Sequence, residues 1–166
     1  MILLVRVDNR LVHGQILETW VPRLGAKEVV VADDDAAASP LARAALTLCV
    51  PPDLSVRIER IAAVDWAALA GSRTPTLVIL REVEGLRQAR GGGLAPGMAP
   101  RVNLGNIHFA PDRRSVTASV FLSRGEIDAL RALQRDGFEV EARPIPTEPP
   151  LGLDEIERRF EAAPPA

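Results

Sequence analysis

The sequence predicts an α/β fold, a single-domain three-layer α/β/α sandwich built on a mostly parallel, doubly wound sheet. Short apolar runs of the kind found in buried strands alternate along the chain with longer segments of helical pattern. Strands separated by helices of this length form right-handed βαβ units, and such units place the strands parallel. The length of 166 residues suits one domain over residues 1–166.

Each expected element has a local signal in the sequence. Apolar or alternating runs predict strands at 2–7, 28–32, 54–61, 76–80, 102–105, 115–122 and 138–145. Helical patterns predict helices at 14–24, 41–48, 64–70, 82–90, 123–135 and 153–162. Ser39 and Pro40 supply the N-cap and the first turn of the second helix, and Ser123 with Glu126 has the spacing of a capping box.

The composition narrows the classes of function. A net charge of −2 provides no field that favours nucleic acid, and the apolar runs are too short for direct insertion into a membrane. The N-terminus lacks a signal-peptide pattern, and a single cysteine allows no internal disulfide, so we expect a reducing cytoplasm. We expect that cysteine, Cys49, to be buried as a small hydrophobic residue.

A metal or cofactor site is not expected. Two histidines and one cysteine are a poor supply of metal ligands. The three aspartates at 33–35 carry no further ligand spacing, so a solvated turn after a strand is expected there. The glycines at 91–93 lack the lysine and the strand-to-helix context of a phosphate-binding loop.

The most informative segment is the turn after the first strand, residues 6–15, with the sequence RVDNRLVHGQ. It places His13 between an apolar strand and a helix, with Gly14 directly after it. The first amides of a helix have no internal partner and the helix dipole is positive there, so such turns bind anions. A histidine in this position is suited to act as a nucleophile toward a phosphoryl group, and the covalent adduct would be stabilised.

The arginines and the aspartate before His13 are candidates for supporting roles. Arg10 is expected to hold two phosphoryl oxygens and to offset charge in the transition state; a surface salt bridge with Asp8 is the alternative. Asp8 is expected to orient the imidazole, to hold Arg10 or to form the hydrogen bonds to nearby backbone that are typical of aspartate in turns. Arg6 stands at the end of the strand, where a structural ion pair is as well supported as a phosphoryl contact.

Further candidates lie in the same turn and in a later loop. The amides of Gly14 and Gln15 are placed to face phosphoryl oxygens, and Asn9 is a further phosphoryl-binding or orienting candidate. His108 either forms a hydrogen bond within the fold or forms a wall of the site beside His13.

Residues 6–15 resemble the first motif of the IIB subunits of the mannose/fructose/sorbose family of the bacterial phosphoenolpyruvate-dependent sugar phosphotransferase system (PTS). The resemblance continues with Trp20 and with residues 30–34, 103–109 and 140–147, so it covers nearly the whole chain in the right order. It implies a cytoplasmic α/β subunit that receives a phosphoryl group from a phosphohistidine on a IIA domain. It also implies transfer of that group to a sugar held by membrane IIC and IID subunits, as a protein-N(pi)-phosphohistidine–sugar phosphotransferase. The phosphorylated histidine of the family falls on His13.

The resemblance also implies a docking face and leaves two alternatives open. The IIA donor is expected to meet the turn at 8–13, the turn after Ala32 and the loop around His108, with Arg6, Arg10 and Arg81 as a positive rim. The chain would act transiently at the inner face of the membrane. A regulatory module phosphorylated on His13, without sugar transport, is the first alternative, and a plain anion-binding domain is the second. The sequence leaves open whether the chain forms a homo-oligomer.

Overall fold

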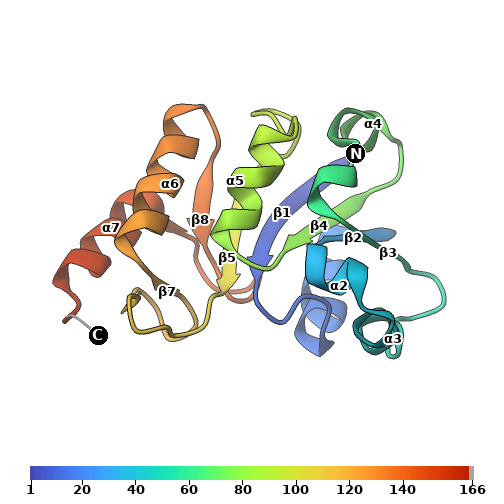
Figure 1. The fold of residues 1–166 in the computed structure, drawn as a ribbon, viewed down its shortest axis with the longest axis horizontal. Coiled ribbons are helices and arrows are strands. Elements are labelled where there is room, and N and C mark those ends of the chain that lie inside the picture. The colour runs from blue at the N-terminus through green and yellow to red at the C-terminus, as the bar shows by residue number, and fades with distance from the viewer. Residues whose placement is uncertain (165–166) are drawn as a thin grey trace.

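The central sheet has seven strands in the order β3-β2-β4-β1-β5-β8-β9, in a computed structural model that describes residues 1–164 (Figure 1). Every neighbouring pair in it is parallel except β8 with β9, which is antiparallel. The strands are β1 (Ile2–Asp8), β2 (Glu28–Ala32), β3 (Ser55–Glu59), β4 (Thr76–Leu80), β5 (Val102–Asn106), β8 (Val140–Ala142) and β9 (Leu151–Gly152). A separate short hairpin pairs β6 (Arg114–Ser115) with β7 (Phe121–Leu122).

Helices cover both faces of the sheet, which gives the expected three layers. One face packs against α4 (Trp66–Gly71), α5 (Val83–Gly91), α6 (Arg124–Arg135) and α7 (Leu153–Ala162), together with the 3₁₀ turn η2 (Ile61–Ala63). The other face packs against the π-helix η1 (Ile16–Trp20), α1 (Val21–Leu24), α2 (Asp34–Ala38) and part of α3 (Pro40–Thr47). The α/β/α architecture predicted from the alternation of strands and helices is therefore confirmed.

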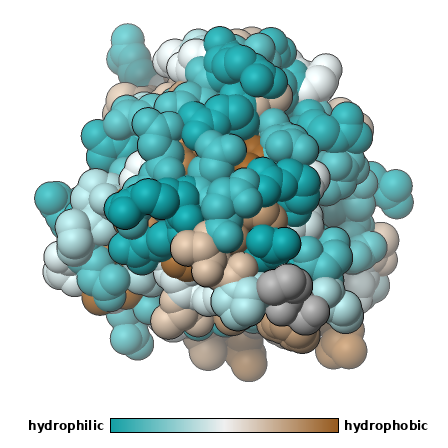
Figure 2. Space-filling model, turned by 90° about the vertical axis from the view of Figure 1, so that its left-hand side faces the viewer, coloured by the Kyte–Doolittle hydropathy of each residue, from teal (hydrophilic) through white to brown (hydrophobic). Residues whose placement is uncertain are grey.

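The side chains of each central strand alternate between two cores, one on each face of the sheet. In β2, Val30 faces the core under α4 and α5, whereas Val29 and Val31 face the core under η1 and α2. Because strands covered on both faces expose neither set of side chains, they read in the sequence as continuous apolar runs. The outer surface over α6 and α7 is mostly hydrophilic (Figure 2), and ion pairs such as Arg124 with Glu161 join these two helices there.

The carboxyl ends of four parallel strands meet at one edge of the sheet. The register pairs Asp8 of β1 with Asn106 of β5, and it pairs Leu80 of β4 with both Val7 of β1 and Ala32 of β2. Strand β1 therefore ends level with its neighbours. In an open α/β sheet, ligands bind at this edge.

Three of the expected elements differ from the structure, and one short strand was not expected. The helix expected at 14–24 is divided into η1 and α1, and Gly25 in the left-handed conformation ends it. The segment at 115–122 is mostly turn between β6 and β7. The last strand is short, because Pro144 and Pro146 follow it and proline has no amide to donate to a sheet. Strand β9 carried no signal in the sequence.

The expectation of a buried Cys49 is wrong. The thiol is exposed, because Cys49 follows the end of α3 and this helix lies at the periphery and buries none of its residues fully. Along residues 1–164, the structure contains no helix that is both long enough and apolar enough to cross a membrane.

Candidate active site

His13 lies in a tight turn at the carboxyl edge of the sheet, between the end of β1 and the first helical residues, Gly14 and Gln15. The turn is closed by Leu11, whose φ of 55° is left-handed and whose side chain is buried. The carbonyl of Leu11 lies 2.9 Å from His13 Nδ1. Because a carbonyl only accepts, this contact is a hydrogen bond in the tautomer that carries the proton on Nδ1. Nε2 is buried, and it has no hydrogen-bond partner within the described chain.

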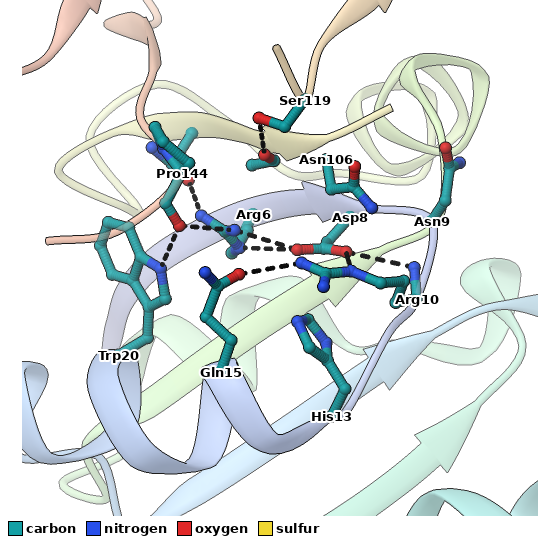
Figure 3. Close-up of polar contacts among 12 residues, drawn as sticks. Arg6, Asp8, Asn9, Arg10, His13, Gln15, Trp20, Asn106, Ser119 and Pro144 are labelled. Atoms are coloured by element: carbon teal, nitrogen blue, oxygen red, sulfur yellow. Dashed lines mark hydrogen bonds and ion pairs between the residues drawn. The ribbon is translucent and has the colours of Figure 1, made fainter. Parts of the chain in front are cut away.

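The Arg10 guanidinium is held on the side of the cluster toward which the His13 imidazole points (Figure 3). Asp8 Oδ1 accepts from the Arg10 backbone amide at 3.1 Å and from its Nε at 3.4 Å. Arg10 Nη2 donates to Gln15 Oε1 at 2.9 Å. With its amide oxygen toward the donors, Asn106 accepts from Arg10 Nε at 3.0 Å. Among the described residues, Arg10 Nη1 has no partner, so it remains free for an anion.

Asp8 and Arg6 are fully buried beneath this turn. Arg6 Nη2 lies 2.9 Å from Asp8 Oδ2, which is the structural ion pair that the sequence allowed. Burial lowers the pKa of Arg6, and the charge and hydrogen bonds of Asp8 oppose that shift. The expectation that Arg6 belongs to an exposed positive rim is wrong, because the side chain points into the interior between β1 and β5.

Asn9 joins three loops at the same edge. Its Nδ2 donates to the carbonyl of Arg81 at 2.9 Å, and its Oδ1 accepts from the backbone amide of His108. His108 is exposed, and its Nε2 lies 3.1 Å from the Asn106 oxygen that also accepts from Arg10. His108 is therefore connected to the Arg10 cluster through Asn106, and Asn9 holds the loops that carry these residues.

The expectation of a solvated turn at the three aspartates after β2 is wrong. Asp33 is the N-cap of α2, which begins at the next residue. Asp33 is buried, accepts from the amide of Ala36 at 2.8 Å as the N-cap of α2, and binds Arg81 through two hydrogen bonds of 2.7 and 2.8 Å. Burial works to raise the pKa of Asp33, but the hydrogen bonds from Arg81 and Ala36 and the charge of Arg81 outweigh it and lower that pKa. Asp34 accepts from the amide of Ile61 at 2.9 Å.

Sequence reasoning missed Asn106 and Asn103 as residues of this cluster. Asn103 is fully buried and contacts Arg6, while Asn106 contacts Arg10 and His108. The signal available in the sequence was an amide side chain at each end of a short apolar strand, where the interior would otherwise favour apolar residues.

The model of the family described as "PTS system sorbose subfamily IIB component" matches residues 2–163 of the chain. The chain belongs to this family. It is therefore a phosphotransferase component of the sugar PTS, a system that also contains IIA and IIC/IID components. This confirms the membership and the activity class that the sequence motifs predicted.

Curated relatives and solved structures agree with this assignment. The N-acetylgalactosamine-specific phosphotransferase enzyme IIB component 2 of Escherichia coli (strain K12) is 30% identical over 153 residues, which cover 92% of this chain and 96% of the relative. The mannose-specific EIIAB component of the same strain is 26% identical over 157 residues, covering 92% of this chain and 47% of the relative. The IIBSor domain of the sorbose permease from Klebsiella pneumoniae has the same fold, with a TM-score of 0.83 at 22% identity, covering 95% of this chain and 97% of that one.

Proposed function

We propose that His13 is the phosphorylated residue of this IIB component. It accepts a phosphoryl group from a phosphohistidine on a IIA domain and passes it to a sugar held by membrane IIC and IID subunits. The observation that carries the proposal is the placement of His13 in a turn beside a fixed arginine whose Nη1 has no partner within the described chain.

The chemistry is an in-line displacement at phosphorus. The unprotonated ring nitrogen of His13 attacks, a new N–P bond forms, and the N–P bond to the donor histidine breaks, with its electron pair returning to the donor imidazole. The donor imidazole then takes up a proton from water. Transfer to the sugar reverses the roles: a sugar hydroxyl oxygen forms the O–P bond, the N–P bond to His13 breaks, and the hydroxyl proton leaves to solvent.

Arg10 stabilises the charge on the equatorial oxygens during both steps. Its guanidinium presents donors in a fixed fork, and charge-assisted hydrogen bonds of this kind are roughly twice as strong as neutral ones. The carboxylate of Asp8 stays beneath the arginine rather than facing the phosphoryl group, so it holds Arg10 without repelling the substrate. The backbone amides of Gly14 and Gln15, at the start of the helical turn, would supply the remaining contacts to the phosphoryl oxygens.

Phosphorylation is tested by incubating the protein with phosphoenolpyruvate, the two general phosphotransferase proteins and the cognate IIA domain, followed by intact mass spectrometry. We expect one added phosphoryl group that is lost in acid and retained in base. His13→Ala should abolish it, whereas His108→Gln, which replaces the other histidine of the chain, should still be phosphorylated. Phosphate on His108, on a serine or on an aspartate would contradict the proposal.

Transfer onward separates this proposal from a regulatory role. Membrane vesicles that contain the cognate IIC and IID subunits and a panel of radiolabelled sugars should accept the phosphoryl group from phosphorylated protein. Stable phosphorylation of His13 that no sugar discharges would favour the regulatory module instead.

A further inference from the structure

Arg6 makes more contacts than a buried ion pair requires. Its Nε and Nη2 donate to Asp8 Oδ2 at 3.3 and 2.9 Å, and Nη2 also donates to the carbonyl of Pro144 at 3.1 Å. Its Nη1 donates to Asn103 Oδ1 at 2.5 Å and to the carbonyl of Arg143 at 3.0 Å. A guanidinium has five N–H groups, so each of them has an acceptor.

The surroundings fix this guanidinium in one position. Its Cζ lies 4.9 Å from the centroid of the Trp20 ring, and Trp20 Nε1 donates to the same Pro144 carbonyl at 3.1 Å. On the neighbouring strand β5, a Cβ added to Gly105 would lie 1.9 Å from Arg6 Cζ, so only glycine lets the guanidinium lie against this strand. Four segments of the chain, β1, η1, β5 and the residues after β8, therefore hold one side chain (Figure 3).

The Asp8 carboxylate transmits this position to the active site. Its Oδ2 faces Arg6, and its Oδ1 holds the backbone amide and the Nε of Arg10. A carboxylate bound on one oxygen by a fixed fork has no freedom to rotate, so the direction of its other oxygen is also fixed. Without Arg6, the carboxylate would be free to turn, and of its three anchors Arg10 would lose the one on Asp8.

We propose that Arg6 is a positioning residue for phosphoryl transfer, acting through Asp8 to hold Arg10 beside His13. The inference rests on the proposed function, since it requires Arg10 to contact the transferred group. A purely structural ion pair would support stability alone, and its loss would lower stability without a specific effect on the transfer step.

A double-mutant cycle distinguishes the two roles. Single-turnover transfer from phosphorylated IIA to His13 is measured as a function of donor concentration for the parent, Arg6→Met, Arg10→Ala and the double variant. We expect Arg6→Met to lower the maximal rate at least tenfold while the half-saturating donor concentration changes little. In the Arg10→Ala background, Arg6→Met should lower the rate less than about threefold further, because residues that act as one unit are not additive.

The matched control is Thr76→Val at the amino end of the sheet. Thr76 is also fully buried and donates to Glu28 Oε2 at 3.0 Å, so this variant loses a partly buried hydrogen bond far from His13. It should unfold at a lower urea concentration than the parent and transfer at the parental rate. If Arg6→Met does not fold, Arg6→Lys takes its place in the cycle. Lysine keeps the charge but cannot satisfy all five acceptor contacts. The same non-additivity with Arg10→Ala is expected.

The outcomes separate this inference from the proposed function. A parent protein that is never phosphorylated on His13 overturns both. A parent that is phosphorylated, with Arg6 and Arg10 effects that multiply, or with an Arg6 variant that transfers at the parental maximal rate, overturns the positioning role alone.

Discussion

Arg10, which we propose contacts the transferred group, is fixed in position by its neighbours. Its half-exposed side chain is fixed by Asp8, Gln15 and Asn106, which belong to three different segments of the chain. A long flexible arginine held in this way loses its conformational entropy during folding rather than during catalysis. The sequence alternative of a plain surface salt bridge with Asp8 does not describe this arrangement, because Asp8 is buried.

Replacing Arg10 with alanine should slow phosphoryl transfer to and from His13 while leaving the fold intact. The loss of one charge-assisted contact in the transition state is worth roughly 2–3 kcal/mol, or about a 30- to 150-fold change in rate. Rapid-quench measurements of transfer from phosphorylated IIA give the rate, and circular dichroism checks the fold. Arg10→Lys keeps the charge without the fork, and its transfer rate should lie between those of the parent and Arg10→Ala. If Arg10→Ala transfers at the parental rate, Arg10 is only a surface ion-pair residue.

At the scale of elements, the start of α2 joins two strand ends. Asp33 follows β2, caps α2 and binds Arg81 at the end of β4, so one carboxylate fixes a helix and two loops. Arg81 also donates to the carbonyl of Asn9 at 3.4 Å, which extends the connection to the His13 turn. A charge that supports several elements makes their stability depend on pH.

Asp33→Asn should remove part of the acid dependence of stability. The folded-state pKa of Asp33 is lowered, so the unfolded state takes up the proton first. Its stabilisation is therefore fully present above the ordinary aspartate pKa of about 3.9 and is lost as the pH falls through that value toward the lower folded-state pKa. Asparagine caps helices as well as aspartate does, so the variant loses mainly the ion pair with Arg81.

Urea denaturation between pH 7 and pH 3 tests this expectation. The parent should lose more unfolding free energy on acidification than Asp33→Asn, and the variant should be less stable at pH 7. Asp65→Asn makes the same change at the N-cap of α4, where the carboxylate accepts from the amide of Ala68, and should be less destabilising at pH 7. Identical pH profiles of the parent and Asp33→Asn would contradict the role given to this ion pair.

At the scale of the whole molecule, the parallel sheet brings the residues proposed for transfer and for docking to one edge. The expected rim of three arginines is reduced there, because Arg6 is buried and the charge of Arg81 is balanced by Asp33. Arg10 remains partly exposed, and the loop around His108 adds the exposed ring of Phe109, which stacks edge-on against Phe121. A mixed apolar and basic surface of this kind suits a transient protein contact.

Binding of the IIA donor should perturb the loops at this edge. In titrations of isotopically labelled protein, amide shifts are expected in the turn at 8–13, in the turn after Ala32 and around His108. The affinity should fall as salt rises, because Arg10 and the helical turn after His13 attract an acidic partner surface. The contact must break after each transfer, so we expect a weak interface. Shifts confined to α7, or an affinity independent of salt, would place the docking face elsewhere.

The sequence by itself determined the fold class, the order of the main elements and the identity of His13 as the central candidate. Apolar runs mark buried strands, caps such as Ser39 and the Ser123–Glu126 box mark helix starts, and the structure confirms these caps. Such signals are local, because neighbouring residues along the chain share one helix face or one strand. Only the tertiary structure decided that Arg6 is buried and satisfied by acceptors about 97 and 137 residues away. A charged side chain carries no local sign of its burial, since the groups that compensate for its lost hydration come from strands that meet only when the sheet forms.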